Sequence, residues 1–187
     1  MKNKKWSEYL WLVTIPYFVL GYFNIMFAWI GMIFFMTPLA FAIFKGNKTY
    51  CHNYCERGQF YTVVGKKLSR NKPMPKFMTT SAFRYGFLTF FMVMFANMIF
   101  TTYLVFSSAQ DLKEVVTLFW TFKLPWNYVV TSDIPTWVVQ YAFGFYSMML
   151  TSASLGFITM ILYKPRSFCV YCPMGTMTQT ICKIKSK

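Results

Sequence analysis

The stretch YLWLVTIPYFVLGYFNIMFAWIGMIFFMTPLAFAIF, Tyr9–Phe44, runs for 36 residues without a charged side chain. One membrane-spanning helix needs about 20 apolar residues, so this run is long enough for two helices joined by a tight turn. Gly21 and Asn24 supply turn-forming residues near its middle. The pattern therefore predicts transmembrane helices over roughly residues 6–22 and 26–44. A cleaved signal peptide is not expected, because its apolar region would be about half as long.

Composition and two later apolar stretches extend the same architecture along the chain. Hydrophobic residues make up 56% of the sequence and charged residues only 13%, which is typical of an integral membrane protein. The stretches Tyr85–Gln110 and Ile134–Tyr163 predict two further helices, at about residues 85–106 and 137–163. The predicted fold class is all-α: a polytopic membrane helical bundle of about four transmembrane helices, forming a single domain over residues 1–187.

Basic residues are distributed unevenly about these helices. Four crossings place the N-terminus, residues 45–84 and residues 164–187 on one side of the membrane, and that side holds 17 of the 19 lysines and arginines. Cytoplasmic loops are enriched in such residues, so we expect both termini and both segments to face the cytoplasm, with the chain in the inner membrane of the cell. The bilayer then accounts for the net charge of +14, and no nucleic-acid partner is expected.

Two short cysteine pairs, Cys51-His52-Asn53-Tyr54-Cys55 and Cys169-Val170-Tyr171-Cys172-Pro173, each follow a predicted helix on this basic side. The cytoplasm keeps thiols reduced, so short-spaced pairs there bind metal or do redox chemistry more often than they form structural disulfides. Because both helices end on the same side, we expect the bundle to bring all four sulfurs to one patch. The predicted ligands are Cys51, Cys55, Cys169 and Cys172.

Four thiolates suit either a zinc ion or an iron–sulfur cluster, and spacing alone does not separate the two. Cys172 is followed by Pro173, as in the C-P ending of ferredoxin-type cluster motifs. Pro173 also suits the first position of a helix, which we expect to reach about Lys183. Cys182 lies on that helix as an alternate ligand, although a small packed side chain is the simpler interpretation. The only histidine, His52, is a weaker candidate, and its being alone argues against a bis-histidine haem.

The segments Tyr50–Gly58 and Cys169–Thr176 resemble the motifs of membrane iron–sulfur proteins with a 4Fe-4S binding domain, such as NapH and the membrane portion of NosR. The resemblance implies a 4Fe-4S cluster as cofactor and a role in moving electrons between quinol and periplasmic reductases. Glu56 stands where such relatives often have proline. The larger relatives also carry a ferredoxin module with C-x2-C-x2-C-x3-C-P runs, which this sequence lacks. The resemblance thus implies an electron-transfer subunit that passes electrons to a partner redox protein or membrane complex, more than a complete enzyme.

Two other classes of function stay open at this point. A structural or sensory membrane protein would hold zinc through the same four thiolates and have no redox activity. A thiol–disulfide oxidoreductase of the DsbB type also has four helices and two cysteine pairs. That activity needs its pairs in the oxidising compartment, whereas the basic residues here place them in the cytoplasm.

The remaining segments carry weaker expectations. Residues Glu56–Ser69 read as a short amphipathic helix on the membrane surface that covers the site, with Phe60, Val63, Val64 and Leu68 on its apolar face. Residues Asp111–Phe122 read as an amphipathic cap on the outer side. In the last predicted helix, small and hydroxyl residues such as Ser147 and Thr151 indicate close helix packing.

Two groups of polar side chains have candidate functional roles. Gln140, Tyr141 and Tyr146 are candidates for hydrogen bonds to a quinone near the outer interface. Basic residues flank the cysteine pairs and would offset the negative charge of a cluster, although the positive-inside bias explains them equally well; they are Arg57, Lys164, Arg166 and Lys48.

Overall fold

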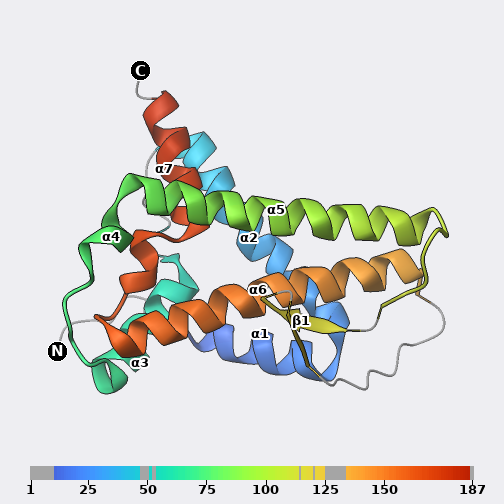
Figure 1. The fold of residues 1–187 in the computed structure, drawn as a ribbon, viewed down its shortest axis with the longest axis horizontal. Coiled ribbons are helices and arrows are strands. Elements are labelled where there is room, and N and C mark those ends of the chain that lie inside the picture. The colour runs from blue at the N-terminus through green and yellow to red at the C-terminus, as the bar shows by residue number, and fades with distance from the viewer. Residues whose placement is uncertain are drawn as a thin grey trace.

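The computed structural model describes residues 11–46, 51, 54–113, 115–119, 121–124 and 134–185, and this part is mostly helical (Figure 1). Its elements in chain order are α1 (Trp11–Phe23), the 3₁₀ helix η2 (Ile25–Phe27), α2 (Ala28–Lys45), α3 (Glu56–Leu68), α4 (Lys76–Thr79), α5 (Ser81–Phe106), β1 (Val116–Leu118), β2 (Phe122–Leu124), α6 (Thr136–Leu162), the 3₁₀ helix η4 (Ser167–Val170) and α7 (Pro173–Lys185).

The long helices occupy the regions where the sequence predicts them. η2 with α2, then α5 and α6, cover the predicted helices within a few residues, and α5 begins four residues earlier than expected. α1 matches the first predicted helix from Trp11 onward, and residues 6–10 lie outside the described part. Asn24 forms the expected turn, because its Oδ1 accepts a hydrogen bond from the Met26 amide (3.0 Å). Gly21 lies inside α1, where a Cβ atom would overlap the ring of Tyr146.

Three helical segments are long and apolar enough to cross a membrane: Ile25–Lys45, Ser81–Phe106 and Thr136–Leu162. The apolar part of α1, Leu12–Phe23, is shorter than these. At 1.5 Å per residue, the 13 residues of α1 extend over about 20 Å, less than the roughly 30 Å of a bilayer core. All four crossings therefore stay predictions, and the described part of α1 is the shortest of the four segments.

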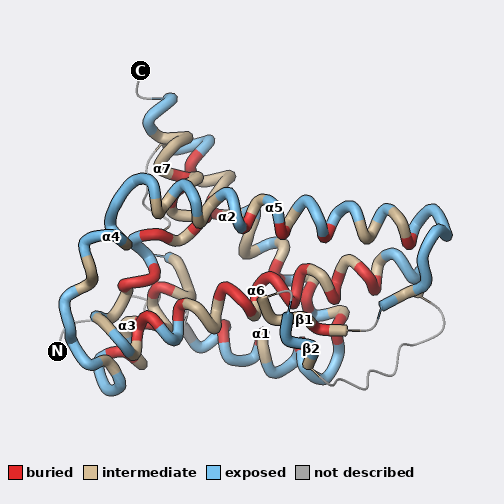
Figure 2. The backbone as a smooth tube through the Cα atoms, viewed as in Figure 1, coloured by how far each residue is buried: buried red, intermediate tan, exposed pale blue. Residues whose placement is uncertain are grey.

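α6 is the central helix of the bundle. Of its apolar window, 56% is buried, against 22% for each of the other two candidate spans. α5 runs antiparallel along one side of α6, α1 lies along the other side, and α2 crosses α6 and then pairs with α7 (Figure 1). Figure 2 shows the buried positions concentrated on α6, while the outer face of α5 is exposed. Exposed apolar side chains on the outer helices suit contact with lipid.

Three apolar clusters are stacked along α6, and each joins it to different elements. The first contains Ile25, Val116 and Phe143, the second contains Tyr17, Phe91 and Phe145, and the third contains Tyr61, Met160, Phe168 and Tyr171. The third cluster brings α3 and η4 onto the last turns of α6, next to the cysteine pairs.

The segment after α5 differs from the predicted amphipathic cap and from the all-α fold class. β1 and β2 form an antiparallel hairpin, with Thr117 paired to Lys123, and Val116 is fully buried against α6. Three backbone amides of this segment donate to side chains along one stripe of α6: Lys113 N to Gln140 Oε1 (3.0 Å), Thr117 N to Ser147 Oγ (3.1 Å) and Phe119 N to Thr151 Oγ1 (3.4 Å). The hairpin therefore folds back along α6 toward the middle of the bundle.

The hydroxyl groups of Ser147 and Thr151 each donate a hydrogen bond within α6 and accept one from the hairpin. Ser147 Oγ donates to the Phe143 carbonyl (2.7 Å) and Thr151 Oγ1 donates to the Ser147 carbonyl (2.8 Å), so each hydroxyl keeps a lone pair for a hairpin amide. Strand backbone away from water needs such acceptors, because a buried amide without a partner is costly. The small polar stripe of α6, expected to pack against another helix, binds the hairpin backbone.

Replacing Thr151 by valine keeps the side-chain shape and removes the acceptor of the Phe119 amide. We expect a loss of about 1 kcal/mol of stability, since a buried donor is left without a partner. Thr89→Val is the matched control, because Thr89 is exposed on α5 and, among the residues that the structure describes, its hydroxyl bonds the Tyr85 carbonyl alone (3.0 Å). Thermal unfolding in detergent measures both variants; equal midpoints would contradict a stabilising role for this stripe.

Candidate metal centre

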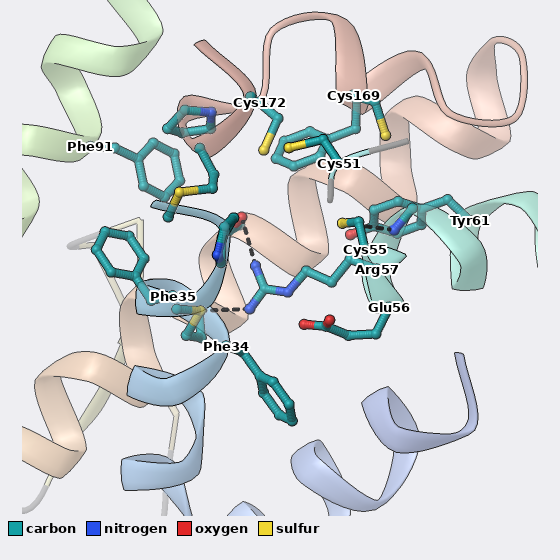
Figure 3. Close-up of a pocket in the computed structure, with 18 of the residues that line it drawn as sticks. Phe34, Phe35, Cys51, Cys55, Glu56, Arg57, Tyr61, Phe91, Cys169 and Cys172 are labelled. Carbon is teal, nitrogen blue, oxygen red and sulfur yellow. Dashed lines mark hydrogen bonds between the residues drawn. The ribbon is translucent and has the colours of Figure 1, made fainter. Parts of the chain in front are cut away.

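Cys51, Cys55, Cys169 and Cys172 line a single cavity of about 130 Å³ at the end of the bundle where α2, α3, α6 and α7 meet. Figure 3 shows their sulfurs gathered around this space, above the side chains of α2. All four are free thiols. Within the described residues, no three histidine, cysteine or acidic side chains converge closely enough to hold one metal ion. The cavity offers roughly ten times the space that one water molecule needs.

The first pair is positioned by the end of α2 and the start of α3. Gly46 caps α2 in the left-handed conformation (φ 63°), a geometry that favours glycine. Cys55 caps the N-terminus of α3, where its Sγ accepts a hydrogen bond from the Gly58 amide (3.4 Å). Cys51 lies 3.7 Å from the Thr178 hydroxyl, measured from its sulfur, and so contacts α7.

The second pair is positioned by η4 and by the start of α7. Cys169 lies in η4, and Cys172 immediately precedes Pro173, the first residue of α7. The predicted helix from Pro173 is therefore present, and it extends to Lys185. The amides of Gly175 and Met174 point at the Cys172 sulfur. Helix N-termini favour negative charge, so this arrangement suits a thiolate.

Burial affects the ionisation of the thiols. Burial raises the pKa of Cys172, and the amides of Gly175 and Met174 oppose that rise only in part. Burial also raises the pKa of Cys55 well above its usual range, and the adjacent Glu56 carboxylate adds to the effect. Without a metal these thiols are neutral at physiological pH. Coordination requires thiolates, so loading the site must release protons.

Two glycines, which have no side chain, leave space open at the edge of the cavity. A Cβ atom on Gly58 would stand 3.6 Å from Cys55 Sγ and 3.7 Å from Cys169 Sγ, between the two pairs. One on Gly175 would stand 3.6 Å from the Cys169 carbonyl oxygen. A side chain at Gly58 would occupy space that a group bridging these sulfurs needs. The residues present therefore fit a bulky group held by four thiolates.

α3 is docked on α6 by a stripe of residues that the sequence analysis did not single out. The helix itself is present; on its predicted apolar face Phe60 and Val64 pack against the Tyr61 cluster, whereas Val63 and Leu68 are 40% and 50% exposed. The buried stripe is Gly58, Tyr61 and Gly65. Two glycines spaced around an aromatic residue were the available signal, since small residues let helices approach closely.

Tyr61 is the main contact between α3 and α6. Its hydroxyl donates to the Ala153 carbonyl (3.1 Å), and its ring lies over Gly156, where a Cβ atom would overlap it. Arg166 adds a second link, because its Nε donates to the Thr62 hydroxyl (2.6 Å). These contacts fix the helix that carries Cys55 relative to the segment that carries Cys169.

The other predicted site residues have different outcomes. Cys182 is half-buried on α7 and is not among the residues lining the cavity. His52 and Lys48 lie outside the described residues. The three quinone candidates are bonded within the protein: Gln140 accepts from the Lys113 amide, Tyr141 contacts Met32 and Tyr146 donates to the Phe18 carbonyl (3.0 Å). The predicted quinone site at these three residues stays an untested prediction.

Replacing Gly156 by alanine should separate α3 from α6, because the added Cβ overlaps Tyr61. Overpacking of this kind costs about 1–3 kcal/mol. Gly86→Ala is the control: Gly86 lies in α5 with open space around it, so alanine there should be neutral or stabilising. Thermal midpoint and metal content per chain measure the effect. A Gly156→Ala protein that matches wild type in both would contradict this role of the Tyr61 contact.

Comparison with known proteins identifies the same two regions of the chain. A family model described as a 4Fe-4S binding domain matches residues 27–75 and 147–187. The first segment contains Cys51 and Cys55, and the second contains Cys169, Cys172 and Cys182. No curated protein matches the chain, and no solved structure does. The match supports a 4Fe-4S cluster as the cofactor.

Proposed function

We propose that this chain is an integral membrane electron-transfer protein that holds one 4Fe-4S cluster through Cys51, Cys55, Cys169 and Cys172. The observation that carries the proposal is the cavity that these four cysteines share, although they come from two matched segments far apart in the sequence. A bound cluster supplies one-electron transfer. The chain supplies four sulfur ligands, amides directed at Cys172 and an apolar wall that limits access of water.

The size of the site favours a cluster over the alternative of a structural zinc ion. Four thiolates around one zinc ion lie at about 2.3 Å from the metal, which leaves no cavity between them. Here the sulfurs surround a space of about 130 Å³, with Gly58 and Gly175 on its walls. A thiol–disulfide oxidoreductase is not favoured either, because the pairs are suited to ligate one group together.

Electrons would enter from the membrane and leave toward a partner. A second cavity, of about 410 Å³, lies between α1, α3 and α6 and shares Arg57 and Tyr61 with the cysteine cavity. Its largely apolar wall suits the ring of a quinol donor, as in electron transfer of the NapH and NosR kind. Cys169 is the exposed member of the four cysteines, and the exposed Lys164 lies near it in sequence. A partner redox protein with an acidic surface suits that edge.

Both cysteine pairs should lie on one side of the membrane, whether or not α1 crosses it. The chain between the pairs contains α5 and α6, so it crosses twice and returns to the side from which it left. Residues 45–84 contain nine lysines and arginines, and residues 164–187 contain five. The positive-inside bias then places the cluster and the C-terminus in the cytoplasm, with the chain in the inner membrane.

Metal analysis of anaerobically purified protein in detergent tests the cofactor. We expect about four iron and four acid-labile sulfide per chain. Cys172→Ser should lose most of both, because it removes a thiol that lines the cavity, whereas Cys182→Ser should retain them, because Cys182 does not line it. One zinc per chain without sulfide would contradict the proposed function. Equal loss in the two variants would contradict the assignment of the ligands.

Reporter fusions test the orientation. Alkaline phosphatase, which is active only outside the cytoplasm, should be active when fused after Ala109 and inactive when fused after Lys187. A fluorescent protein that folds in the cytoplasm should give the opposite pattern and serves as the control for expression. Phosphatase activity at Lys187 with none at Ala109 would place the cluster on the other side of the membrane.

A further inference from the structure

Arg57 follows Cys55 by two residues, but its side chain turns into the bundle. Figure 3 shows the guanidinium extending from α3 past Cys55 toward α2 and α6. One nitrogen donates to Ser152 Oγ (3.2 Å), and another contacts the Met149 sulfur. Arg57 also lines the cavity of the four cysteines. The positive charge of Arg57 therefore lies inside the cavity, against α6. The positive-inside bias explains basic residues on the surface, and Arg57 is not one of them.

The charge of Arg57 is poorly compensated by these two contacts. Both acceptors are neutral, and a thioether sulfur is a weak acceptor. Arg57 is half-buried, and taking a cation out of water is costly unless negative charge balances it. Glu56 also lines the cavity and is adjacent in sequence to Cys55. The guanidinium of Arg57 extends further in, to Ser152 and Met149 on α6.

We propose that Arg57 is the built-in counter-cation of the cluster and that it raises the reduction potential of the cluster by stabilising the reduced form. This inference rests on the proposed function. A 4Fe-4S cluster with four thiolates has a net charge of about −2 when oxidised and about −3 after it accepts one electron, with no proton taken up. A fixed positive charge in the same cavity attracts the reduced form more strongly.

A redox titration with soluble mediators, followed by absorbance and electron paramagnetic resonance, tests this role. We expect Arg57→Gln to lower the ratio of reduced to oxidised cluster at least tenfold at the wild-type midpoint, a shift of about 59 mV to lower potential for one electron. Arg57→Lys keeps the charge and should stay nearer to wild type.

Arg70→Gln is the matched control. Arg70 is exposed just beyond the other end of α3, roughly 20 Å from Arg57 along the helix direction, and solvent and salt screen its charge. Its midpoint should equal that of wild type. Arg57→Gln with an assembled cluster and an unchanged midpoint would overturn the inference, as would an equal shift in Arg70→Gln.

Assembly of the cluster separates this inference from the proposed function. A wild-type protein without iron and sulfide overturns the proposed function itself. If Arg57→Gln fails to assemble, Arg57→Met replaces it as an unbranched neutral variant. Loss of the cluster in both neutral variants, with retention in Arg57→Lys, supports the need for a positive charge. Loss in Arg57→Lys as well overturns the inference, because the shape of arginine is then what matters.

Discussion

The contact of α3 with α6, made by Tyr61 over Gly156, is the interaction on which the cysteine site depends. The second cysteine pair follows α6 by way of η4, and Cys55 caps the start of α3, so the separation of α3 and α6 affects the distance between the two pairs. The same docking directs Arg57 to Ser152, one turn from Gly156 on α6. Ligand spacing and local charge in the cavity thus have a common origin in one helix–helix contact.

The helical architecture and the convergence of the cysteines could be predicted from the sequence. Long neutral runs fix the helices, and the position of each pair just after a helix predicts that the four sulfurs meet. Pro173 marks the start of α7 because proline suits the first turn of a helix. These features depend on local composition and on chain connectivity, which a sequence contains directly.

The hairpin and the buried face of α3 could not be predicted in the same way. β1 and β2 have three residues each, and the partners of their segment on α6 are 27 to 32 positions away. Ser147 and Thr151 look the same in sequence whether a helix or a strand packs on them. On α3, apolar periodicity marks Val63 and Leu68, which are exposed, and does not mark Gly58 and Gly65, which are buried beside Tyr61.

The hairpin also has a consequence for the order in which the chain is assembled. Its backbone amides find their acceptors on α6, which is synthesised after them. These amides therefore have no acceptor on α6 until that helix has been made. In the proposed membrane topology, the hairpin folds onto α6 only after α6 has inserted, although the hairpin leaves the ribosome first.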